Sequence, residues 1–406
     1  MSDTRRQFTR TGRGSAASPQ RVRFTMRHAR VALSVFVLAL GASRLAYAQD
    51  ISPRVEVRGF SGWAYGRTND NTYLGGDPRG NYQRGSLAIN LAAHPAPNLS
   101  IISQAFFKQT EEGTESELDY AFAEWRASDA LRVRMGKIKQ PFGISTEVFD
   151  VGTLRPFLSL PQSVYGPLGF VAEGFEGVGV RGERPLGTRW NLSYDAYAGG
   201  IRVADEKHTL RYLTGEPIEL AAEEGEETLT ELLGSRLVVL TPVQGLKLGA
   251  SAYTGREAMD SEHAEATAES VRHTVVGAHA EFLSNRVWVR SEYVHHTEGS
   301  TTTGGSYLET AYFLTRRWQA SARVDKGAAH LGDRDVSAAP SLLKHRDVAV
   351  GANLWVTPEF VLKASIHSVE GNRLAGPRAS ELAATVAAGG LSRRTRLLQV
   401  GTQFSF

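Results

Sequence analysis

The sequence predicts an all-β fold: a transmembrane antiparallel up-and-down β-barrel of about sixteen strands. Three observations predict it. Segments in which apolar and polar residues alternate recur throughout the chain after residue 48. Short connections rich in turn-forming residues alternate with longer ones. No segment after residue 48 has 18 consecutive apolar residues, so strands rather than helices would have to cross a bilayer.

The N-terminal segment has the pattern of a secretory signal. Residues 31–42, VALSVFVLALGA, form an apolar run that is too short to span a bilayer, and several arginines precede it. Ala46, Tyr47 and Ala48 follow as an A-x-A cleavage site. We expect residues 1–48 to be a removed signal peptide and residues 49–406 to form the barrel domain. A retained membrane anchor is the alternative, and Met26 is a second candidate start.

Composition after the leader excludes two function classes. The first 48 residues hold nine arginines and one acid, so the rest has 37 basic and 42 acidic residues, a net charge of −5. This balance does not suggest nucleic-acid binding, and we expect no nucleic-acid partner. The chain has no cysteine, which excludes disulfides and thiol chemistry.

The alternation assigns sixteen candidate strands. Clear examples are VEVRGFSGW (55–63) and VLKASIH (361–367). The candidates span residues 54–66, 83–94, 98–109, 117–126, 130–139, 175–184, 189–200, 232–241, 246–257, 271–283, 286–297, 305–314, 317–327, 345–355, 359–369 and 395–406.

The connections between these strands alternate in length. Those after the even strands are tight, such as PLGT (185–188) and SNR (284–286). Those after the odd strands are predicted to be longer, at 67–82, 110–116, 140–174, 201–231, 258–270, 298–304, 328–344 and 370–394. Short periplasmic turns and long outer loops are typical of an outer-membrane barrel, and an even strand number places both termini in the periplasm.

The two faces of the strands differ in the way a water-filled barrel requires. Residues such as Leu87, Ile89 and Leu91 lie on the face assigned to lipid, whereas Arg132 and Arg134 lie on the other. Aromatic residues gather at the predicted periplasmic ends with the outward parity: Trp190, Phe282, Trp318, Phe360 and Phe406. They predict an interfacial girdle.

The last strand, LLQVGTQFSF, carries an apolar face to the end of the chain. We expect this face to contact lipid and the strand edge to pair with the first strand near 55–63, which closes the barrel. The terminal Phe406 resembles the signal by which the outer-membrane insertion machinery recognises its clients.

The third outer loop, residues 140–174, is long, poor in charge and rich in apolar residues such as Phe142 and Phe157. A solvated loop gains nothing from so much apolar surface, so we expect it to fold into the barrel and narrow the pore. A subunit contact outside the barrel is the alternative. Glu147, Asp150 and Arg155 are the loop charges expected to meet solute.

Catalytic and metal-binding motifs were not found. The chain contains no G-x-S-x-G, H-E-x-x-H or P-loop motif. His295 and His296 are adjacent on a strand and face opposite sides, so they form no metal site by themselves. We expect no catalytic residues, no metal and no cofactor, although a triad assembled from distant strands stays open.

The loop at 201–231 contains nine acidic residues against three basic ones. Several carboxylates suit Ca²⁺, and divalent ions also bridge lipopolysaccharide. A solvated outer loop is the favoured interpretation.

A resemblance extends these expectations. MGKIKQPFG (135–143), which leads into the third loop, and FEGVGVRGE (175–183) after it resemble the phosphate-selective porins (porin O/P type) of Gram-negative bacteria. The resemblance implies a homotrimer of anion channels with cationic residues along the lumen. Inward candidates for this ladder are Arg58, Lys108, Arg132, Arg134, Arg181, Lys247, Arg290, Arg323 and Lys363. The third loop lacks lysine, and inward acids are nearly as many: Glu56, Asp119, Asp195, Glu281, Glu292, Glu309 and Asp325.

The sequence therefore predicts an outer-membrane porin, a passive channel for small hydrophilic solutes with a mild preference for anions such as phosphate or small carboxylates. Its expected partners are these solutes, outer-membrane lipid, lipopolysaccharide and the insertion machinery. Two alternatives remain: an outer-membrane enzyme of the lipase or protease kind, and a surface adhesin or structural barrel with a plugged lumen.

Overall fold

A computed structural model describes residues 54–82, 84–110, 113–148, 150–166, 170–204, 226–257, 271–332, 340–376, 385, 388 and 390–406. The predicted signal peptide and its cleavage site lie outside these residues. No helix in the described ranges is long and apolar enough to cross a membrane.

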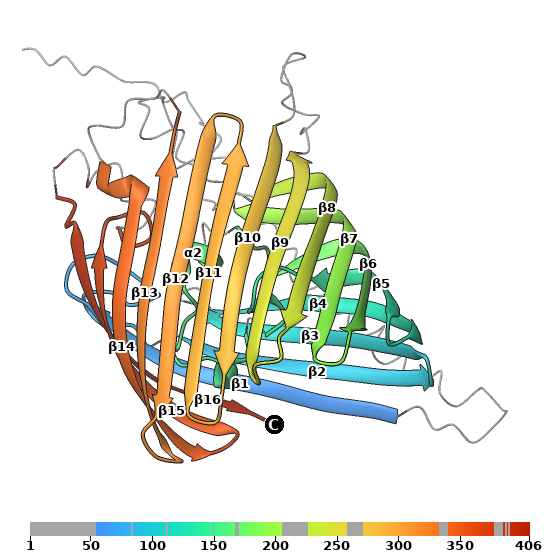
Figure 1. Cartoon of the computed structure of the whole chain (residues 1–406). Helices are drawn as coiled ribbons and strands as arrows, with labels where there is room; N and C mark the ends of the chain where they lie inside the picture. Colours follow the sequence, from blue (N-terminus) through green and yellow to red (C-terminus); the bar gives the residue numbers. More distant parts are fainter. Residues whose placement is uncertain are drawn as a thin grey trace, which may run out of the picture. The chain divides into compact units, whose positions relative to one another are not determined.

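The described residues form sixteen strands, and each corresponds to a predicted one (Figure 1). They are β1 (Arg54–Thr68), β2 (Gly85–Ala96), β3 (Leu99–Thr110), β4 (Gly113–Ser128), β5 (Leu131–Lys139), β6 (Gly174–Leu186), β7 (Trp190–Ala204), β8 (Glu226–Leu240), β9 (Leu246–Glu257), β10 (Arg272–Leu283), β11 (Val287–Glu298), β12 (Thr301–Phe313), β13 (Trp318–His330), β14 (Lys344–Thr357), β15 (Phe360–Glu370) and β16 (Arg394–Ser405).

The strands form a closed antiparallel barrel in which each pairs with its neighbours in sequence. β16 closes the ring by pairing with β1, from Phe60 opposite Ser405 to Thr68 opposite Leu397. The terminal Phe406 extends this seam, because its backbone N–H and C=O both bond to Gly59 at 2.9 Å. The seam thus lies further along β1 than the predicted 55–63.

Two of the predicted long connections are wrong. β3 ends at Thr110 and β4 begins at Gly113, while β11 ends at Glu298 and β12 begins at Thr301. The residues at these positions are polar, but their backbones continue the strand pairing. Backbone hydrogen bonds between neighbouring strands at the rim of a barrel do not require apolar side chains. The strand β8 also starts at Glu226, which shortens the predicted acidic loop; residues 205–225 of that loop lie outside the described part of the chain.

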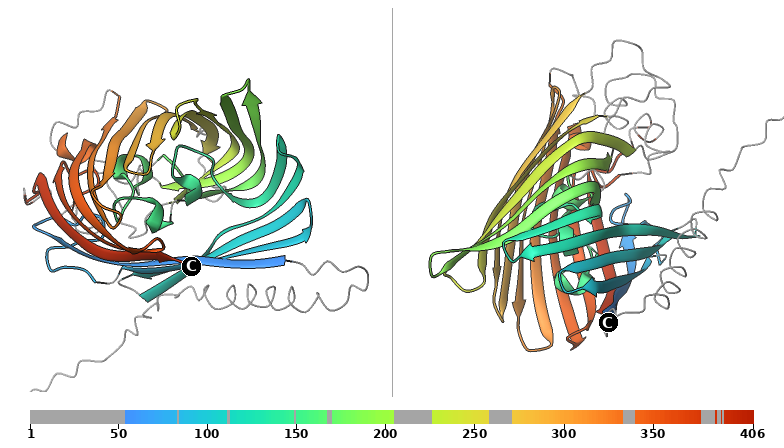
Figure 2. Two further views of the ribbon diagram at one scale, coloured as in Figure 1. Left: turned by 60° about the horizontal axis from the view of Figure 1, so that its bottom comes forward. Right: turned by 90° about the vertical axis from the view of Figure 1, so that its right-hand side faces the viewer.

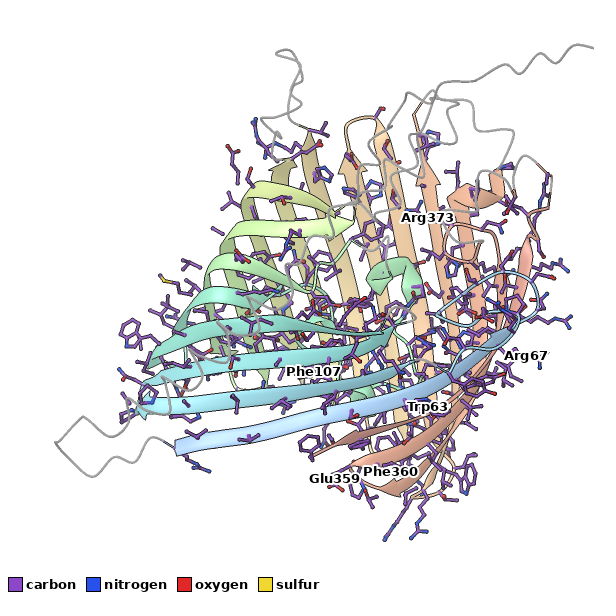
Figure 3. The ribbon with its side chains drawn as sticks, turned by 180° about the vertical axis from the view of Figure 1, so that it is seen from behind. Trp63, Arg67, Phe107, Glu359, Phe360 and Arg373 are labelled. Atoms are coloured by element: carbon purple, nitrogen blue, oxygen red, sulfur yellow. The ribbon has the colours of Figure 1, made fainter. Side chains whose placement is uncertain are left out.

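The outer face of the barrel is apolar. Val57, Met135, Leu237 and Ile366 are among its exposed large side chains. Trp63 lies on the outer side of β1, and Phe360 lies beside Glu359 at the start of β15 (Figure 3). A barrel whose apolar side chains point outward must face lipid, since water would penalise this surface.

The third loop folds into the barrel, as predicted (Figure 2). It contains two 3₁₀ turns, η1 (Thr146–Val148) and η2 (Gly152–Leu154), and the short helix α2 (Gln162–Tyr165). Many of its apolar residues are buried, among them Phe157, and several, including Phe142 and Val164, belong to the main interior core. The apolar composition of this loop therefore reflects packing against the inner wall.

Candidate functional site

Buried charges on the inner wall hold the third loop in place. The Asp325 carboxylate on β13 accepts hydrogen bonds from the backbone N–H groups of Gln162, at 2.6 Å, and Ser163, at 3.2 Å. The Lys363 ammonium on β15 donates to the carbonyl oxygens of Gly152, at 2.8 Å, and Arg155, at 2.5 Å. The backbone groups of this loop have no neighbouring strand to pair with, and side chains of the barrel wall supply their hydrogen-bond partners.

Arg323 on β13 is a further anchor, and its side chain is 0% exposed. Its guanidinium donates to the Ser159 carbonyl at 2.8 Å and lies 3.4 Å from the Glu309 carboxylate. The Phe157 ring covers it, with 4.6 Å from Cζ to the ring centroid. Arg323 and Lys363 were predicted for the solute-facing ladder; the structure instead places both beneath the loop, where they bind its backbone.

Three arginines of the barrel wall gather around one loop carboxylate, and a fourth lies beside them through Glu124. Glu147 lies 2.9 Å from Arg181 on β6, 2.9 Å from Arg236 on β8 and 3.5 Å from Arg134 on β5. Arg132 lies 3.9 Å from Glu124, which also pairs with Arg134 at 2.6 Å. We call Arg132, Arg134, Arg181 and Arg236 the arginine cluster.

The cluster sets the charge state of Glu147. Burial alone would raise the pKa of this carboxyl group, but the guanidinium groups of Arg236 and Arg181 outweigh it and lower the pKa to about 2. The carboxylate therefore stays ionised at neutral pH. Glu124 and Asp195, which pairs with Arg236 at 2.9 Å, also lie within the cluster, and Asp129 lies 4.0 Å from Arg132 at its edge.

Arg236 is a site residue that sequence reasoning missed. It lies in the segment LLGSRLVVL, where apolar residues occupy both faces and hide the two-residue period. The structure shows its inward direction, since Arg236 is opposite the inward-facing Asp195 on β7. Lys139 at the end of β5 was missed too; its ammonium lies 2.6 Å from Asp119 and 3.1 Å from Asp150 of the loop.

The third of the predicted loop charges, Arg155, directly follows η2. Burial lowers the pKa of its guanidinium to about 10, which still leaves it charged at neutral pH. Of the three loop charges predicted to meet solute, Glu147 and Asp150 are thus engaged by wall cations, and the backbone carbonyl of Arg155 accepts a hydrogen bond from Lys363.

The other ladder residues face the lumen at different levels. Lys247 and Arg290 both pair with Glu281, at 3.2 and 2.9 Å. Arg58 bonds to Glu56 at 3.0 Å near the start of β1, and Lys108 is opposite Glu115 near the end of β3.

Some of the predicted inward cations are more exposed than the acids near them. The side chains of Lys247 and Arg132 are 44% and 31% exposed. The side chains of Asp195 and Asp325 are 2% and 0% exposed, and Glu309 is buried beside Arg323. Around the third loop, most of the carboxylates are therefore covered, while several cations retain contact with water.

A serine, a histidine and an aspartate meet on the inner wall of β14 and β15. The Ser365 hydroxyl lies 3.1 Å from Nε2 of His367, whose Nδ1 lies 2.7 Å from the Asp347 carboxylate. This is the connectivity of a hydrolytic triad. All three residues are buried, and the Phe157 ring of the loop packs edge-on against His367. A substrate would reach the hydroxyl only if the loop moved away.

Similar folds occur among outer-membrane proteins. The outer membrane channel DcaP of Acinetobacter baumannii matches with a TM-score of 0.55 and 8% identity, over 89% of this chain and 99% of that one. The anion-selective porin from Comamonas acidovorans gives 0.52 and 10%, over 87% and 100%. OmpT, an outer membrane protein of Vibrio cholerae, gives 0.52 and 10%, over 88% and 99%. No protein-family model and no curated protein matches the chain.

These likenesses concern the fold. A closed sixteen-strand barrel with an apolar outer face is the architecture of proteins that span the outer membrane of Gram-negative bacteria. The chain is accordingly an outer-membrane protein.

Proposed function

We propose that the chain is a porin, a passive diffusion channel for small hydrophilic solutes that prefers anions such as phosphate or small carboxylates. The observation that supports the preference is the unequal exposure beside the third loop. Arg132 and Lys247 keep contact with water, while the nearby carboxylates Asp195 and Glu281 are largely covered. A passing anion therefore meets cations more directly than it meets acids.

The proposed mechanism uses the loop as a constriction and the arginine cluster as a weak anion site. Guanidinium groups are weakly hydrated and present forked donors, so they can replace part of the hydration shell of a carboxylate or phosphate. Glu124, Glu147 and Asp195 partly neutralise the cluster. This keeps an anion from binding so tightly that it fails to leave.

The proposal is tested by the reversal potential of the refolded protein in a planar bilayer with a KCl gradient. We expect a potential of the sign that reports faster chloride than potassium permeation. A potential of the opposite sign would overturn the anion preference, and the absence of single-channel steps would favour the alternative of a barrel with a plugged lumen.

A hydrolase is the second candidate, and the Ser365, His367 and Asp347 contacts are the observation in its favour. Lipid or peptide hydrolysis by the refolded protein that disappears in Ser365→Ala would support it. Labelling by a fluorophosphonate probe would show whether the hydroxyl becomes accessible. Channel activity without labelling supports the porin.

The outer wall carries a basic groove that suits the predicted lipopolysaccharide partner. It has a volume of about 660 Å³ and is lined by residues of β11 to β15, including Lys326, Lys344 and Arg346. In register, Lys326 is opposite Arg346, Arg346 is opposite Glu370, and Glu370 is opposite Arg394. The next outward pair along β13 and β14 is apolar, Val324 opposite Val348. Cations above an apolar band match a glycolipid with phosphates above acyl chains.

We expect the triple variant Lys326→Gln, Arg346→Gln and Arg394→Gln to bind lipid A several-fold more weakly in detergent, with a reduced dependence on salt. The matched control replaces Arg126, Arg184 and Arg189 by glutamine; Arg126 and Arg184 lie near the opposite ends of β4 and β6, and Arg189 lies in the turn before β7. Equal binding by both triple variants would contradict the assignment of the groove.

The phosphate-selective porin resemblance also implies a homotrimer, which stays a prediction for this chain. The mass of the detergent-solubilised protein, measured by light scattering with the detergent subtracted, distinguishes three copies from one.

A further inference from the structure

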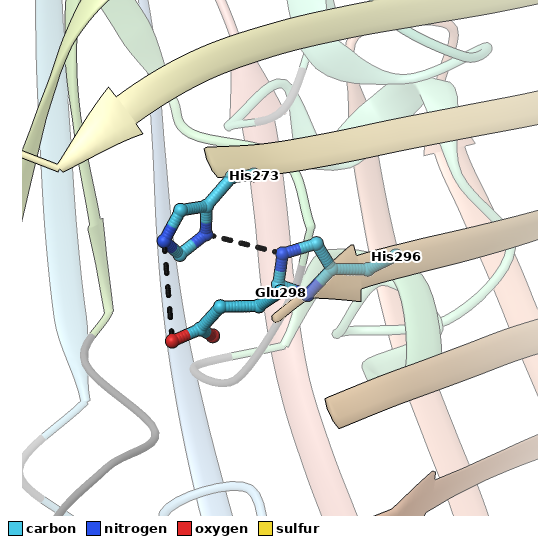
Figure 4. A group of neighbouring side chains, drawn as sticks. All are labelled: His273, His296 and Glu298. Atoms are coloured by element: carbon cyan, nitrogen blue, oxygen red, sulfur yellow. Dashed lines mark hydrogen bonds and ion pairs between the residues drawn. The ribbon is translucent and has the colours of Figure 1, made fainter. Parts of the chain in front are cut away.

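Two histidines from neighbouring strands meet inside the barrel, close to the turn between β11 and β12 (Figure 4). His273 lies on β10 and His296 on β11, and the register places His273 directly opposite Glu298 and Val275 opposite His296. Residues two apart on a strand share a face, so all three side chains project to the same inner side. His273 is buried, while His296 and Glu298 are half-buried.

The geometry of the two imidazoles suits a shared ligand. Nδ1 of His273 lies 3.2 Å from Nε2 of His296. Two nitrogens that each lie about 2.0–2.1 Å from one zinc ion at a tetrahedral angle are about 3.3 Å apart. To share one ion, the two rings would have to turn so that both lone pairs point at the ion rather than along the line between the nitrogens. The competing occupant of this space is a proton shared between the two nitrogens.

The carboxylate of Glu298 stands at the other nitrogen of His273. Its Oε1 lies 4.0 Å from Nε2 of His273, on the side of the ring away from His296. Histidines that bind metals commonly donate their second N–H to a carboxylate, which orients the ring and raises its basicity. On the other side, the Phe170 ring of the third loop packs near His296, with centroids 5.7 Å apart, and limits the motion of that ring.

The donor set indicates the class of ion. Imidazole nitrogens favour Zn²⁺, Ni²⁺ and Cu²⁺, whereas Ca²⁺ and Mg²⁺ favour oxygen ligands. A second group of potential ligands in the described ranges, Asp119, Asp150 and Glu173, differs in this respect. The Lys139 ammonium already lies 2.6 to 3.9 Å from its three carboxylates, so that group has a resident cation.

We propose that His273 and His296 bind one divalent transition-metal ion on the inner wall of the barrel, with Glu298 as the residue that positions His273. Water would fill the remaining coordination positions. The bound ion would add positive charge to the lumen near the ends of β10 and β11. This inference does not depend on the solute preference proposed above.

Binding is tested with Cu²⁺ on the refolded, detergent-solubilised full chain. We expect one tightly bound equivalent whose electron paramagnetic resonance spectrum shows coupling to two nitrogens. The variants His273→Ala and His296→Ala should each lose this signal. His295→Ala is the matched control, because His295 neighbours His296 on β11 and faces the opposite side. A wild-type spectrum that persists in His273→Ala/His296→Ala would overturn the site.

The role of Glu298 has a separate readout. Glu298→Gln should weaken Zn²⁺ binding, measured by calorimetry, by roughly 10- to 100-fold while the two-nitrogen signal with Cu²⁺ remains. An unchanged affinity would remove Glu298 from the assignment. Zn²⁺ should also alter the single-channel current of the wild type and of His295→Ala, and leave that of the double variant unchanged.

Discussion

Arg323→Met is expected to destabilise the folded barrel by roughly 3–5 kcal/mol, because removing one partner of a buried ion pair leaves the other charge uncompensated. The carboxylates of Glu309 and Asp347 lie 3.4 and 4.0 Å from its guanidinium, and the Ser159 carbonyl would lose its donor. Urea unfolding of the refolded protein in detergent, followed by tryptophan fluorescence, measures the change.

The matched control for this substitution is Arg317→Met, in the exposed turn before β13. It should change the free energy of unfolding by no more than about 0.5 kcal/mol. Loosening of the third loop gives Arg323→Met a second signature, a larger and noisier single-channel conductance. A variant as stable as the control, with wild-type conductance, would contradict the anchoring role of Arg323.

The double variant Arg132→Gln/Arg181→Gln is expected to abolish the anion preference. It leaves Arg134 and Arg236 facing Glu124, Glu147 and Asp195, so the carboxylates then outnumber the guanidinium groups. Both side chains are partly exposed, so the fold should tolerate the change better than it tolerates loss of a buried arginine. The reversal potential in a KCl gradient should move through zero toward potassium selectivity.

Arg184→Gln controls for the loss of a guanidinium as such. It lies on the same strand as Arg181 but is exposed on the outer face, opposite Leu192. It should leave the reversal potential unchanged. If the double variant keeps the wild-type potential, the cluster does not govern ion selection and the preference would have to arise elsewhere in the lumen.

Strands and faces were predictable because a barrel strand contacts two different solvents. Lipid outside and polar surroundings inside impose a two-residue period on every strand, as in the alternation of Leu131, Arg132, Val133 and Arg134. The prediction of inward-facing residues failed where apolar residues on both faces hide this two-residue period. At Arg236 the flanking leucines face the third loop on one side and lipid on the other, so both faces are apolar.

The third loop shows a different limit to what the sequence could predict. Its apolar composition predicted that it folds inward, since a solvated loop gains nothing from buried aromatics. Its contacts with Lys363, Asp325 and Glu292 could not be predicted, because each joins residues more than 140 positions apart. Arg323 and Lys363, which were predicted to face the solute, instead bind the loop.

The sequence by itself determined the number of strands, their order and which face of each meets lipid, because these follow from local alternation and turn chemistry. Only the tertiary structure decided which charges stay in water and which side chains meet across strands. The His273 and His296 pair illustrates this, since strand register and loop placement bring their nitrogens to 3.2 Å. Register depends on the closure of the whole barrel, and no local segment contains that information.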